Sequence, residues 1–271
     1  MPEGTEKPLG VAAALAPLLA DPGRAGVLLD LDGTLAPIVS RPEDAAISGV
    51  VRASLEAIAS RYALAAIVTG RSAEVAREIV GLDMLAYAGN HGFELLGPGA
   101  TSAEPAEALR GHASTASEFA AGLGAGELES AGVRIEDKGP IVALHWRRAE
   151  DHVRAEQLVS RIGADAESAG LVTHGGRMVL ELRPRVAIDK GVAVAGLLDG
   201  SPVRAALYAG DDLTDLDAFD ELERRRDDGR LDSIVRVGVS SAEGPSAIAE
   251  RSDLLVAGPG EAASLLMVLA G

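Results

Sequence analysis

The sequence predicts an α/β protein in which a doubly wound, Rossmann-like parallel sheet is interrupted by a second α/β module. Three observations predict this fold: apolar runs that end in acidic residues, amphipathic helical stretches between those runs, and a middle section whose hydrophobic period changes to two. The chain has 271 residues, of which 47% are hydrophobic and 3% are aromatic. We therefore expect a core built from many small aliphatic contacts, in one large domain or two modest ones.

The first and last thirds of the chain alternate helical and apolar segments. In the first third, one helix is expected at residues 11–19, a second around 51–58 and a third that follows residue 71 and ends at 79. Buried strands are expected at 26–30 and 64–68. In the last third, one helix is expected at 190–198, a second begins at 214 and a closing helix ends at 269. Strands are expected at 205–209, 234–239 and 254–256. This alternation predicts parallel strands, whereas residues 1–8, which are polar and carry two prolines, predict a frayed leader.

The middle of the chain has a different rhythm. Residues 141–147 and 178–183 alternate apolar and polar side chains, which is typical of half-buried antiparallel strands. With helices expected at about 105–123 and 149–169, the order of elements indicates an open-faced α/β sandwich. Breakers at residues 97–99 and 183–185 place this insertion at 101–184, between core segments 1–100 and 185–271.

The composition excludes several classes of function. The 25 basic and 41 acidic residues give a formal net charge of -16, which disfavours nucleic acid and anionic membranes as partners. The absence of cysteine excludes disulfides, thiolate chemistry and cysteine-based zinc sites. The apolar stretch 11–20 contains Pro17 and is too short to span a bilayer, so we expect a soluble cytoplasmic protein, monomeric or weakly homo-oligomeric.

Two carboxylates directly after the first apolar strand are the strongest chemical signal. Residues 30–34 read DLDGT, so Asp30 ends a buried strand at the crevice where open α/β sheets bind ligands. A carboxylate there can attack phosphorus, and a second acid, Asp32, can protonate the leaving oxygen and later activate water. The alternative is an ordinary Asp-Gly turn after a core strand.

Two further motifs could hold a phosphoryl group. Residues 68–71 read VTGR, where the hydroxyl of Thr69 and nearby backbone amides could hold phosphoryl oxygens; the alternative is a helix N-cap region. Arg71 is expected to bind the substrate. Residues 189–191 read DKG, where Lys190 at a helix start could neutralise the nucleophile and the phosphoryl group as a point charge. The alternative for Lys190 is a solvated surface lysine.

An acidic cluster follows the strand at residues 205–209. Residues 210–215 read GDDLTD, and the carboxylates of Asp211, Asp212 and Asp215 would repel one another unless a positive charge compensates them. Magnesium, a hard cation that prefers oxygen ligands, is the expected partner. The alternative is a set of acids that cap a helix N-terminus.

These four motifs occur in the same order in the haloacid-dehalogenase superfamily of aspartyl phosphatases, which the sequence resembles in both halves of the core. The resemblance implies that Asp30 is the nucleophile, and that Asp32 is the general acid/base and lends its backbone carbonyl to the metal. It also implies that Thr69 and Lys190 bind the phosphoryl group. The Mg²⁺ site that it implies consists of Asp30, Asp32, Asp211, Asp212 and Asp215.

Three segments resemble the trehalose-6-phosphate phosphatase family more narrowly: residues 89–94 (GNHGFE), 180–184 (LELRP) and 210–219. In that family the inserted module is a cap that closes over the sugar. The predicted sugar contacts in the insertion are Glu136, Lys138, Arg147 and Glu181, and the alternative is a solvated strand face. Asn90 and His91 either touch the sugar or order a loop, and the register of Trp146 predicts that it packs in the cap core.

The predicted reaction is hydrolysis of trehalose 6-phosphate to trehalose and phosphate through a phosphoryl group on Asp30. One alternative is a phosphatase for another phosphorylated sugar or pseudo-sugar. Another is a sensor that accepts phosphate or binds a sugar phosphate without turning it over. Asp32 argues against the sensor, because a phosphoacceptor switch has no use for an acid that protonates a leaving group.

Overall fold

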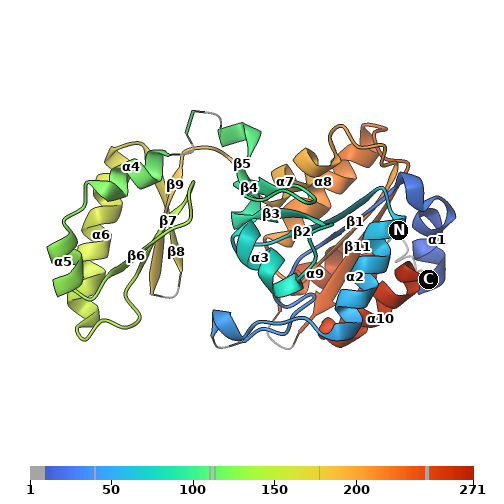
Figure 1. Ribbon diagram of the computed structural model, residues 1–271, viewed down its shortest axis with the longest axis horizontal. Helices are drawn as coiled ribbons and strands as arrows, with labels where there is room; N and C mark the ends of the chain where they lie inside the picture. The colour runs from blue at the N-terminus through green and yellow to red at the C-terminus, as the bar shows by residue number, and fades with distance from the viewer. Residues whose placement is uncertain (1–9, 40, 110, 113, 177, 242–243) are drawn as a thin grey trace, which may run out of the picture. The chain divides into compact units, whose positions relative to one another are not determined.

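The computed structural model describes residues 10–39, 41–109, 111–112, 114–176, 178–241 and 244–271. It divides into a core unit, Met1–Ala103 with Ile188–Gly271, and an inserted unit, Glu104–Ala187 (Figure 1). The insertion expected from the sequence was residues 101–184. The predicted leader, residues 1–8, lies outside the described residues.

The core sheet is parallel except at one edge. Its strands lie in the order β12–β11–β10–β1–β2–β3–β4. The parallel strands are β1 (Ala25–Leu29), β2 (Leu64–Val68), β3 (Ala86–Gly89), β10 (Ala205–Gly210), β11 (Ser233–Ser240) and β12 (Leu254–Ala257). A short strand that the sequence did not predict, β4 (Glu94–Leu96), pairs antiparallel with β3. After β1 the chain adds strands on one side of the sheet, and after β10 it adds strands on the other side. The boundary between β1 and β10 is therefore the switch point where such sheets bind ligands.

Helices cover both faces of the core sheet (Figure 1). One apolar cluster joins the sheet to α1 (Val11–Ala20), α2 (Gly49–Arg61), α3 (Ala73–Val80) and α10 (Gly258–Ala270). The other joins it to α7 (Lys190–Leu198), α8 (Asp215–Asp227) and α9 (Ser246–Arg251). Along β1, Val27 and Leu29 enter the first cluster and Leu28 enters the second, as expected for a strand buried on both faces.

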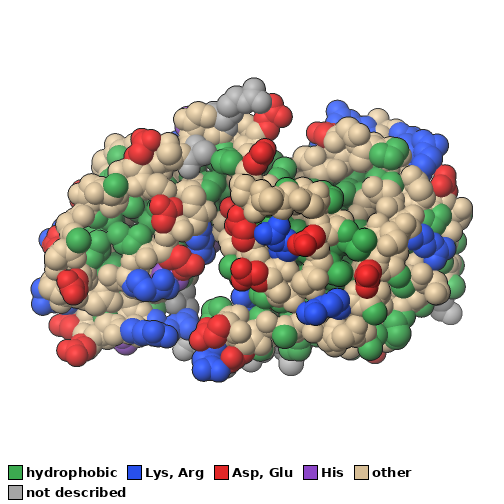
Figure 2. All heavy atoms as spheres, in the orientation of Figure 1, with side chains coloured by type: hydrophobic (Ala, Val, Ile, Leu, Met, Phe, Trp, Pro, Cys, Tyr) green, Lys and Arg blue, Asp and Glu red, His purple; other side chains and the backbone are tan. Residues whose placement is uncertain are grey.

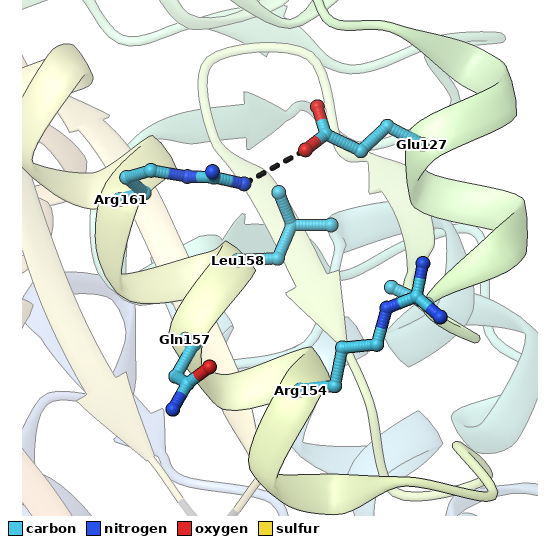
Figure 3. A pocket seen from close by; sticks show the side chains of 6 residues that line it. Glu127, Arg154, Gln157, Leu158 and Arg161 are labelled. Atoms are coloured by element: carbon cyan, nitrogen blue, oxygen red, sulfur yellow. Dashed lines mark hydrogen bonds and ion pairs between the residues drawn. The ribbon is translucent and has the colours of Figure 1, made fainter.

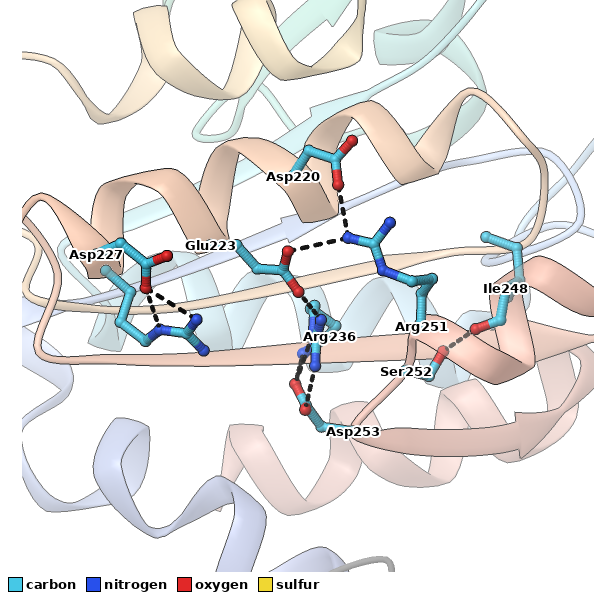
Figure 4. A network of polar contacts seen from close by, with 9 residues as sticks. Asp220, Glu223, Asp227, Arg236, Ile248, Arg251, Ser252 and Asp253 are labelled. Carbon is cyan, nitrogen blue, oxygen red and sulfur yellow. Dashed lines mark hydrogen bonds and ion pairs between the residues drawn. The ribbon is translucent and has the colours of Figure 1, made fainter. Parts of the chain in front are cut away.

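Ion pairs fasten β11 to its surroundings (Figure 4). Arg236 of β11 forms a two-pronged pair with Asp253, which directly precedes β12, and also contacts Glu223 of α8. Arg251, the last residue of α9, pairs with Asp220 at 2.6 Å and with Glu223 at 3.0 Å. This network joins β11 and the residue before β12 to α8 and α9.

The inserted unit is an antiparallel sheet with helices on one face. Its strands, in the order β6–β7–β9–β8, are β6 (Arg134–Asp137), β7 (Val142–His145), β9 (Val179–Pro184) and β8 (Leu171–Gly176). An apolar cluster joins them to α4 (Thr115–Ala121), α5 (Ala125–Ser130) and α6 (His152–Ser168). Strand β5 (Glu104–Pro105) and a 3-10 helix, Glu107–Leu109, precede α4. The fold class expected from the sequence is confirmed.

Two elements of the inserted unit differ from the sequence prediction. The helix expected at 105–123 is broken, because Gly111 adopts a φ of 83° that no right-handed helix allows, and α4 begins only at Thr115. The strand expected at 141–147 ends at His145, where a turn follows. Trp146 packs against the apolar cluster, as predicted.

The surface carries both signs of charge. On the face drawn in Figure 2, Asp and Glu side chains are interspersed with Lys and Arg over both units. No helix in the described part of the chain is both long enough and apolar enough to cross a bilayer.

Candidate active site

The carboxyl ends of three neighbouring core strands carry the predicted catalytic side chains. Asp30 follows β1, Thr69 follows β2 and Asp211 follows β10. The backbone N–H of Asp30 donates to the carbonyl of Ala209 at 2.9 Å, which continues the β1–β10 ladder to the end of the strand. All three side chains are buried. The switch point of the sheet is therefore lined with polar groups that need partners.

Lys190 supplies positive charge to this edge. It is the first residue of α7, whose N-cap Asp189 accepts a hydrogen bond from the N–H of Val192. Its Nζ donates to Asp30 Oδ1 at 2.8 Å and to Asp215 Oδ1 at 2.6 Å, and the side chain is only 2% exposed. Burial alone would lower the pKa of Lys190, but the carboxylates of Asp30 and Asp215 hold that pKa above its usual range. The solvated alternative is excluded.

Asp215 organises the acidic cluster. Besides Lys190, the hydroxyl of Tyr208 donates to Asp215 Oδ1 at 2.7 Å. Asp215 Oδ2 accepts the backbone N–H groups of Asp211 at 2.9 Å and of Asp212 at 3.0 Å. Burial, together with the nearby carboxylate of Asp215, raises the pKa of Tyr208, so the phenol stays a donor. Both oxygens of Asp215 are thus occupied, which suits a residue that fixes the loop and the lysine.

Three carboxylates meet closely enough to hold one cation. One oxygen of each of Asp30, Asp211 and Asp215 lies within 4.8 Å of the other two, although both oxygens of Asp215 already accept hydrogen bonds. Burial, reinforced by Asp215, raises the pKa of Asp211 to about 6, and burial also raises the pKa of Asp30. A divalent cation that prefers oxygen ligands would stabilise buried carboxylates that repel one another in this way, so the donor set fits such an ion.

The loop after β1 packs directly on this cluster. The hydroxyl of Thr34 donates to Asp211 Oδ1 at 3.1 Å. Gly33 has a φ of 88°, and a Cβ at this position would lie 2.2 Å from Asp211 Oδ2. Glycine is therefore required both for the turn and for the close approach of the carboxylate.

The side chains of two predicted metal residues lie outside the three-carboxylate group. Asp212 Oδ1 accepts the N–H and the hydroxyl of Thr214 at 2.8 and 2.6 Å, so this acid closes the turn before α8. Although burial opposes ionisation, Lys190 and these hydrogen bonds lower the pKa of Asp212. Asp32 is instead paired with Arg71 through both carboxylate oxygens, at 2.6 and 2.8 Å.

The loops after β2 and β3 are tied together. The backbone N–H of Asn90 donates to the carbonyl of Arg71 at 2.7 Å, and that of His91 donates to the carbonyl of Thr69 at 2.9 Å. A Cβ on Gly70 would lie 2.8 Å from His91 Nε2, so the glycine of the VTGR motif makes room for the imidazole. The backbone of His91 thus ties the loop after β3 to the loop after β2.

Asn90 combines a positive φ angle with a buried polar side chain. Asn90 and His91 both have positive φ angles, 50° and 58°, which non-glycine residues adopt rarely. The Asn90 side chain is buried, and its Nδ2 and Oδ1 make no hydrogen bond to any residue that the structure describes. Leaving a buried amide without hydrogen bonds costs about 1–3 kcal/mol of folding free energy. A polar ligand or water that bonds to this amide would remove that cost and would therefore bind favourably here.

Two residues of the site were missed by sequence reasoning. Tyr208 carries a hydroxyl in an otherwise apolar strand, two residues before Gly210, and that mismatch was the available signal. Glu94 is also buried, and its Oε1 accepts the N–H of Ala73 at 2.7 Å, which fixes the start of α3. Glu94 belonged to a motif recognised by resemblance, yet nothing local indicated its partner.

The sheet of the inserted unit has a polar face opposite its helices. Glu136 and Glu181 both lie directly across from Ala143, so two carboxylates flank a small side chain. Lys138 Nζ pairs with Glu181 Oε1 at 3.3 Å, and Arg183 grips Oε2 with Nε at 3.0 Å and Nη2 at 2.5 Å. Burial would raise the pKa of Glu181, but Arg183 and Lys138 lower it. Three of the four predicted sugar contacts thus come from this face or its edge.

The fourth predicted contact lies elsewhere. Arg147 is exposed in the turn after β7, because the strand ends two residues earlier than its alternating pattern predicted. The polar side chain at the end of that strand is His145, whose Nε2 lies 2.7 Å from Glu136 Oε2. A pocket of about 470 Å³ between α5 and α6 is lined by Glu127, Ala131, Arg154, Gln157, Leu158 and Arg161, none of them a predicted site residue (Figure 3).

Known proteins resemble this chain over most of its length. The trehalose-phosphate phosphatase of Mycobacterium marinum is 36% identical over 202 residues, which cover 73% of this chain and 51% of that protein. An uncharacterized glycosyl hydrolase of Mycobacterium tuberculosis is 38% identical over 207 residues, 73% of this chain and 15% of that protein. The chain therefore spans about half or less of these relatives.

Solved structures share the fold. The C-terminal domain of Candida albicans trehalose-6-phosphate phosphatase superposes with a TM-score of 0.70 at 21% identity, covering 97% of this chain and 98% of that one. A haloacid dehalogenase-like hydrolase from Bacteroides thetaiotaomicron superposes with a TM-score of 0.61 at 13% identity, covering 90% and 99%. The sequence profile of the trehalose-phosphatase family matches residues 28–256. The chain belongs to the trehalose-phosphatase family.

Proposed function

We propose that this protein hydrolyses trehalose 6-phosphate to trehalose and phosphate through a phosphoryl group carried on Asp30. The observation that carries the proposal is the pairing of a buried carboxylate, Asp30, with a buried lysine, Lys190, beside two further acids at the switch point of the sheet. Membership of the trehalose-phosphatase family, with a match over residues 28–256, supports the choice of substrate.

The first half of the reaction transfers the phosphoryl group to the protein. An oxygen of Asp30 bonds to phosphorus, and the bond from phosphorus to the sugar oxygen breaks with its electron pair on that oxygen. The carboxyl of Asp32 gives its proton to the departing oxygen. Lys190 holds positive charge next to Asp30, while the hydroxyl of Thr69 and backbone amides bind phosphoryl oxygens.

The second half returns the protein to its starting state. The oxygen of a water molecule bonds to phosphorus, the bond from phosphorus to Asp30 breaks, and Asp32 takes up a proton from that water. Phosphate leaves, and Asp30 is again a carboxylate. The two carboxylates divide the work: Asp30 forms the covalent bond and Asp32 moves the protons.

The proposed cofactor is Mg²⁺, because the donors are carboxylate oxygens. Asp30 and Asp211 would hold the ion, and Asp215 would fix the loop that carries Asp211. When bound, the ion supplies positive charge that stabilises the phosphoryl oxygens. The raised pKa of Asp211 supports this assignment, since that carboxylate lacks sufficient compensation from the protein alone.

Recognition of the sugar is assigned to the polar face of the inserted sheet. Glu136, Lys138 and Glu181 offer charged hydrogen-bonding groups that suit several hydroxyls. Asn90 is a further candidate, because its buried amide has both a donor and an acceptor to offer a ligand. The net charge of -16 supports a small sugar phosphate rather than a nucleic acid as substrate.

The test is a panel of sugar phosphates, assayed by phosphate release with and without Mg²⁺. We expect kcat/KM to be highest for trehalose 6-phosphate, activity to disappear with a chelator, and Asp30→Asn to abolish turnover. A preference above about tenfold for another sugar phosphate would reject the substrate and keep the chemistry. Near-normal turnover by Asp30→Asn would reject the mechanism, and no phosphate release from any ester would favour a sensor.

A further inference from the structure

Arg71 and Asp32 form a two-pronged ion pair at the carboxyl edge of the core sheet. Nε of Arg71 donates to Asp32 Oδ2 at 2.6 Å, and Nη2 donates to Oδ1 at 2.8 Å. Asp32 follows β1, and Arg71 follows the neighbouring strand β2. One planar guanidinium group therefore engages both oxygens of Asp32, which fixes the plane of the carboxylate as well as its position.

Arg71 is itself anchored at several points. Its Nη1 donates to the carbonyl of Pro42 at 2.9 Å, and its backbone N–H donates to the hydroxyl oxygen of Thr69 at 3.2 Å. Its backbone carbonyl accepts the N–H of Asn90 at 2.7 Å. The guanidinium is thus held by Pro42, and the backbone from which the side chain extends is held by Thr69 and Asn90, so Arg71 is anchored at both ends and can support Asp32.

The proposed chemistry depends on where the Asp32 carboxyl points. The leaving group of a sugar phosphate is an alkoxide, which departs slowly unless its oxygen receives a proton as the bond breaks. Asp32 must therefore stand within hydrogen-bond reach of that oxygen. An aspartate with 35% of its side chain exposed can adopt other rotamers unless a neighbour restrains it, and the neighbour that does so is Arg71.

We propose that Arg71 is a positioning residue that orients Asp32 for proton transfer to the sugar oxygen: when one oxygen of Asp32 carries the proton, the guanidinium keeps its bond to the other oxygen. The proposal rests on the proposed function, because it takes Asp32 to be the general acid. It differs from the role expected from the sequence, in which Arg71 contacts the substrate directly. Loss of positioning should slow only esters whose leaving group needs a proton. Loss of phosphoryl binding should slow every phosphate monoester, because all of them carry the same phosphoryl group.

The experiment compares two esters in single-turnover formation of the phosphoenzyme by the full chain with Mg²⁺. The alkyl ester is trehalose 6-phosphate, and the aryl ester is p-nitrophenyl phosphate, whose phenolate leaves readily without a proton. We expect Arg71→Met to slow the alkyl reaction about 10- to 100-fold and the aryl reaction about threefold or less. Arg71→Lys keeps the charge but loses the fork, so its alkyl-to-aryl ratio should fall between those of wild type and Arg71→Met.

Two controls separate positioning from loss of charge or of fold. Arg77→Met removes an arginine of α3 that donates to the carbonyl of Ala100 and should leave the alkyl-to-aryl ratio within about twofold of wild type. In an Asp32→Asn background, Arg71→Met should not change that ratio by more than about twofold, because the acid that it orients is gone. If Arg71→Met does not fold, the same comparison is made with Arg71→Lys.

The outcomes separate this proposal from the proposed function. Equal slowing of both esters, an unchanged ratio, or a further fall of the ratio in the Asp32→Asn background would each overturn the positioning role, while the phosphatase assignment would stand. If the wild type forms a phosphoenzyme from another sugar phosphate but not from trehalose 6-phosphate, the proposed substrate is rejected. The other sugar phosphate then replaces trehalose 6-phosphate as the alkyl ester in the comparison. Absence of any phosphoenzyme would overturn both.

Discussion

Tyr208 tests whether the hydrogen bonds to Asp215 hold the acidic cluster together. The variant Tyr208→Phe keeps the ring, including its edge-to-face contact with Phe219, and removes only the hydroxyl that donates to Asp215 Oδ1. A buried hydrogen bond to a charged group contributes about 1.5–3 kcal/mol, so we expect a loss of that size in the free energy of unfolding. Because Asp215 also holds Lys190, kcat should fall by at least about threefold.

Tyr87 provides a matched control for this prediction. Its ring is equally buried, but its hydroxyl donates to a neutral acceptor, the carbonyl of Leu82, at 2.6 Å. Tyr87→Phe should cost only about 0.5–1.5 kcal/mol and leave kcat within about twofold of wild type. Urea unfolding is followed by far-UV circular dichroism, because the fluorescence of Trp146 reports on the inserted unit. Equal losses for the two variants, with full activity in both, would refute the reasoning.

Three further predictions follow from other parts of the chain. Glu181→Gln should raise KM for trehalose 6-phosphate about tenfold, whereas Glu127→Gln on α5 should leave it unchanged; equal effects would contradict sugar binding by the sheet face. Because the pKa of Asp211 is raised to about 6, its carboxylate binds a proton below that pH, and titration calorimetry should find Mg²⁺ affinity about tenfold lower at about pH 5 than at about pH 7. Arg236→Met should destabilise the core by about 1–3 kcal/mol in urea unfolding, and Arg226→Met, which removes an exposed pair with Asp227 on α8, far less; equal losses would argue against the network.

The helices and strands of the core followed closely from the sequence because burial and local chemistry agree there. The strand at 64–68 and the helix at 190–198 have the predicted bounds, since each apolar run is closed by a polar or turn-forming residue. The inserted unit was harder to predict. Its first helix looked continuous in an alanine-rich stretch, but the backbone at Gly111 turns the chain out of the helical region. Helix propensity does not reveal which glycine will adopt a positive φ.

The location of the site was also predictable, because polar residues at the ends of adjacent parallel strands must meet. Asp30, Thr69 and Asp211 needed only the order of the strands to be brought together. The partners of long side chains were not predictable in this way. Arg71 was expected to contact the substrate, and its pairing with Asp32, which is close in space but 39 residues away in sequence, was not foreseen. Spacing along the chain carries no information about such a pair.

The three acids after β10 show what decides the role of a carboxylate in a cluster. They lie within five residues, and the sequence assigned all of them to the metal. In the structure, the donors that each one meets come from different places: Thr34 for Asp211, Thr214 for Asp212, and both Lys190 and Tyr208 for Asp215. Within this cluster, a carboxylate whose two oxygens are both filled by protein donors fixes the loop, whereas one that keeps an oxygen available can bind a cation. The donors, and not the spacing of the acids, therefore separate the organiser Asp215 from the metal candidate Asp211.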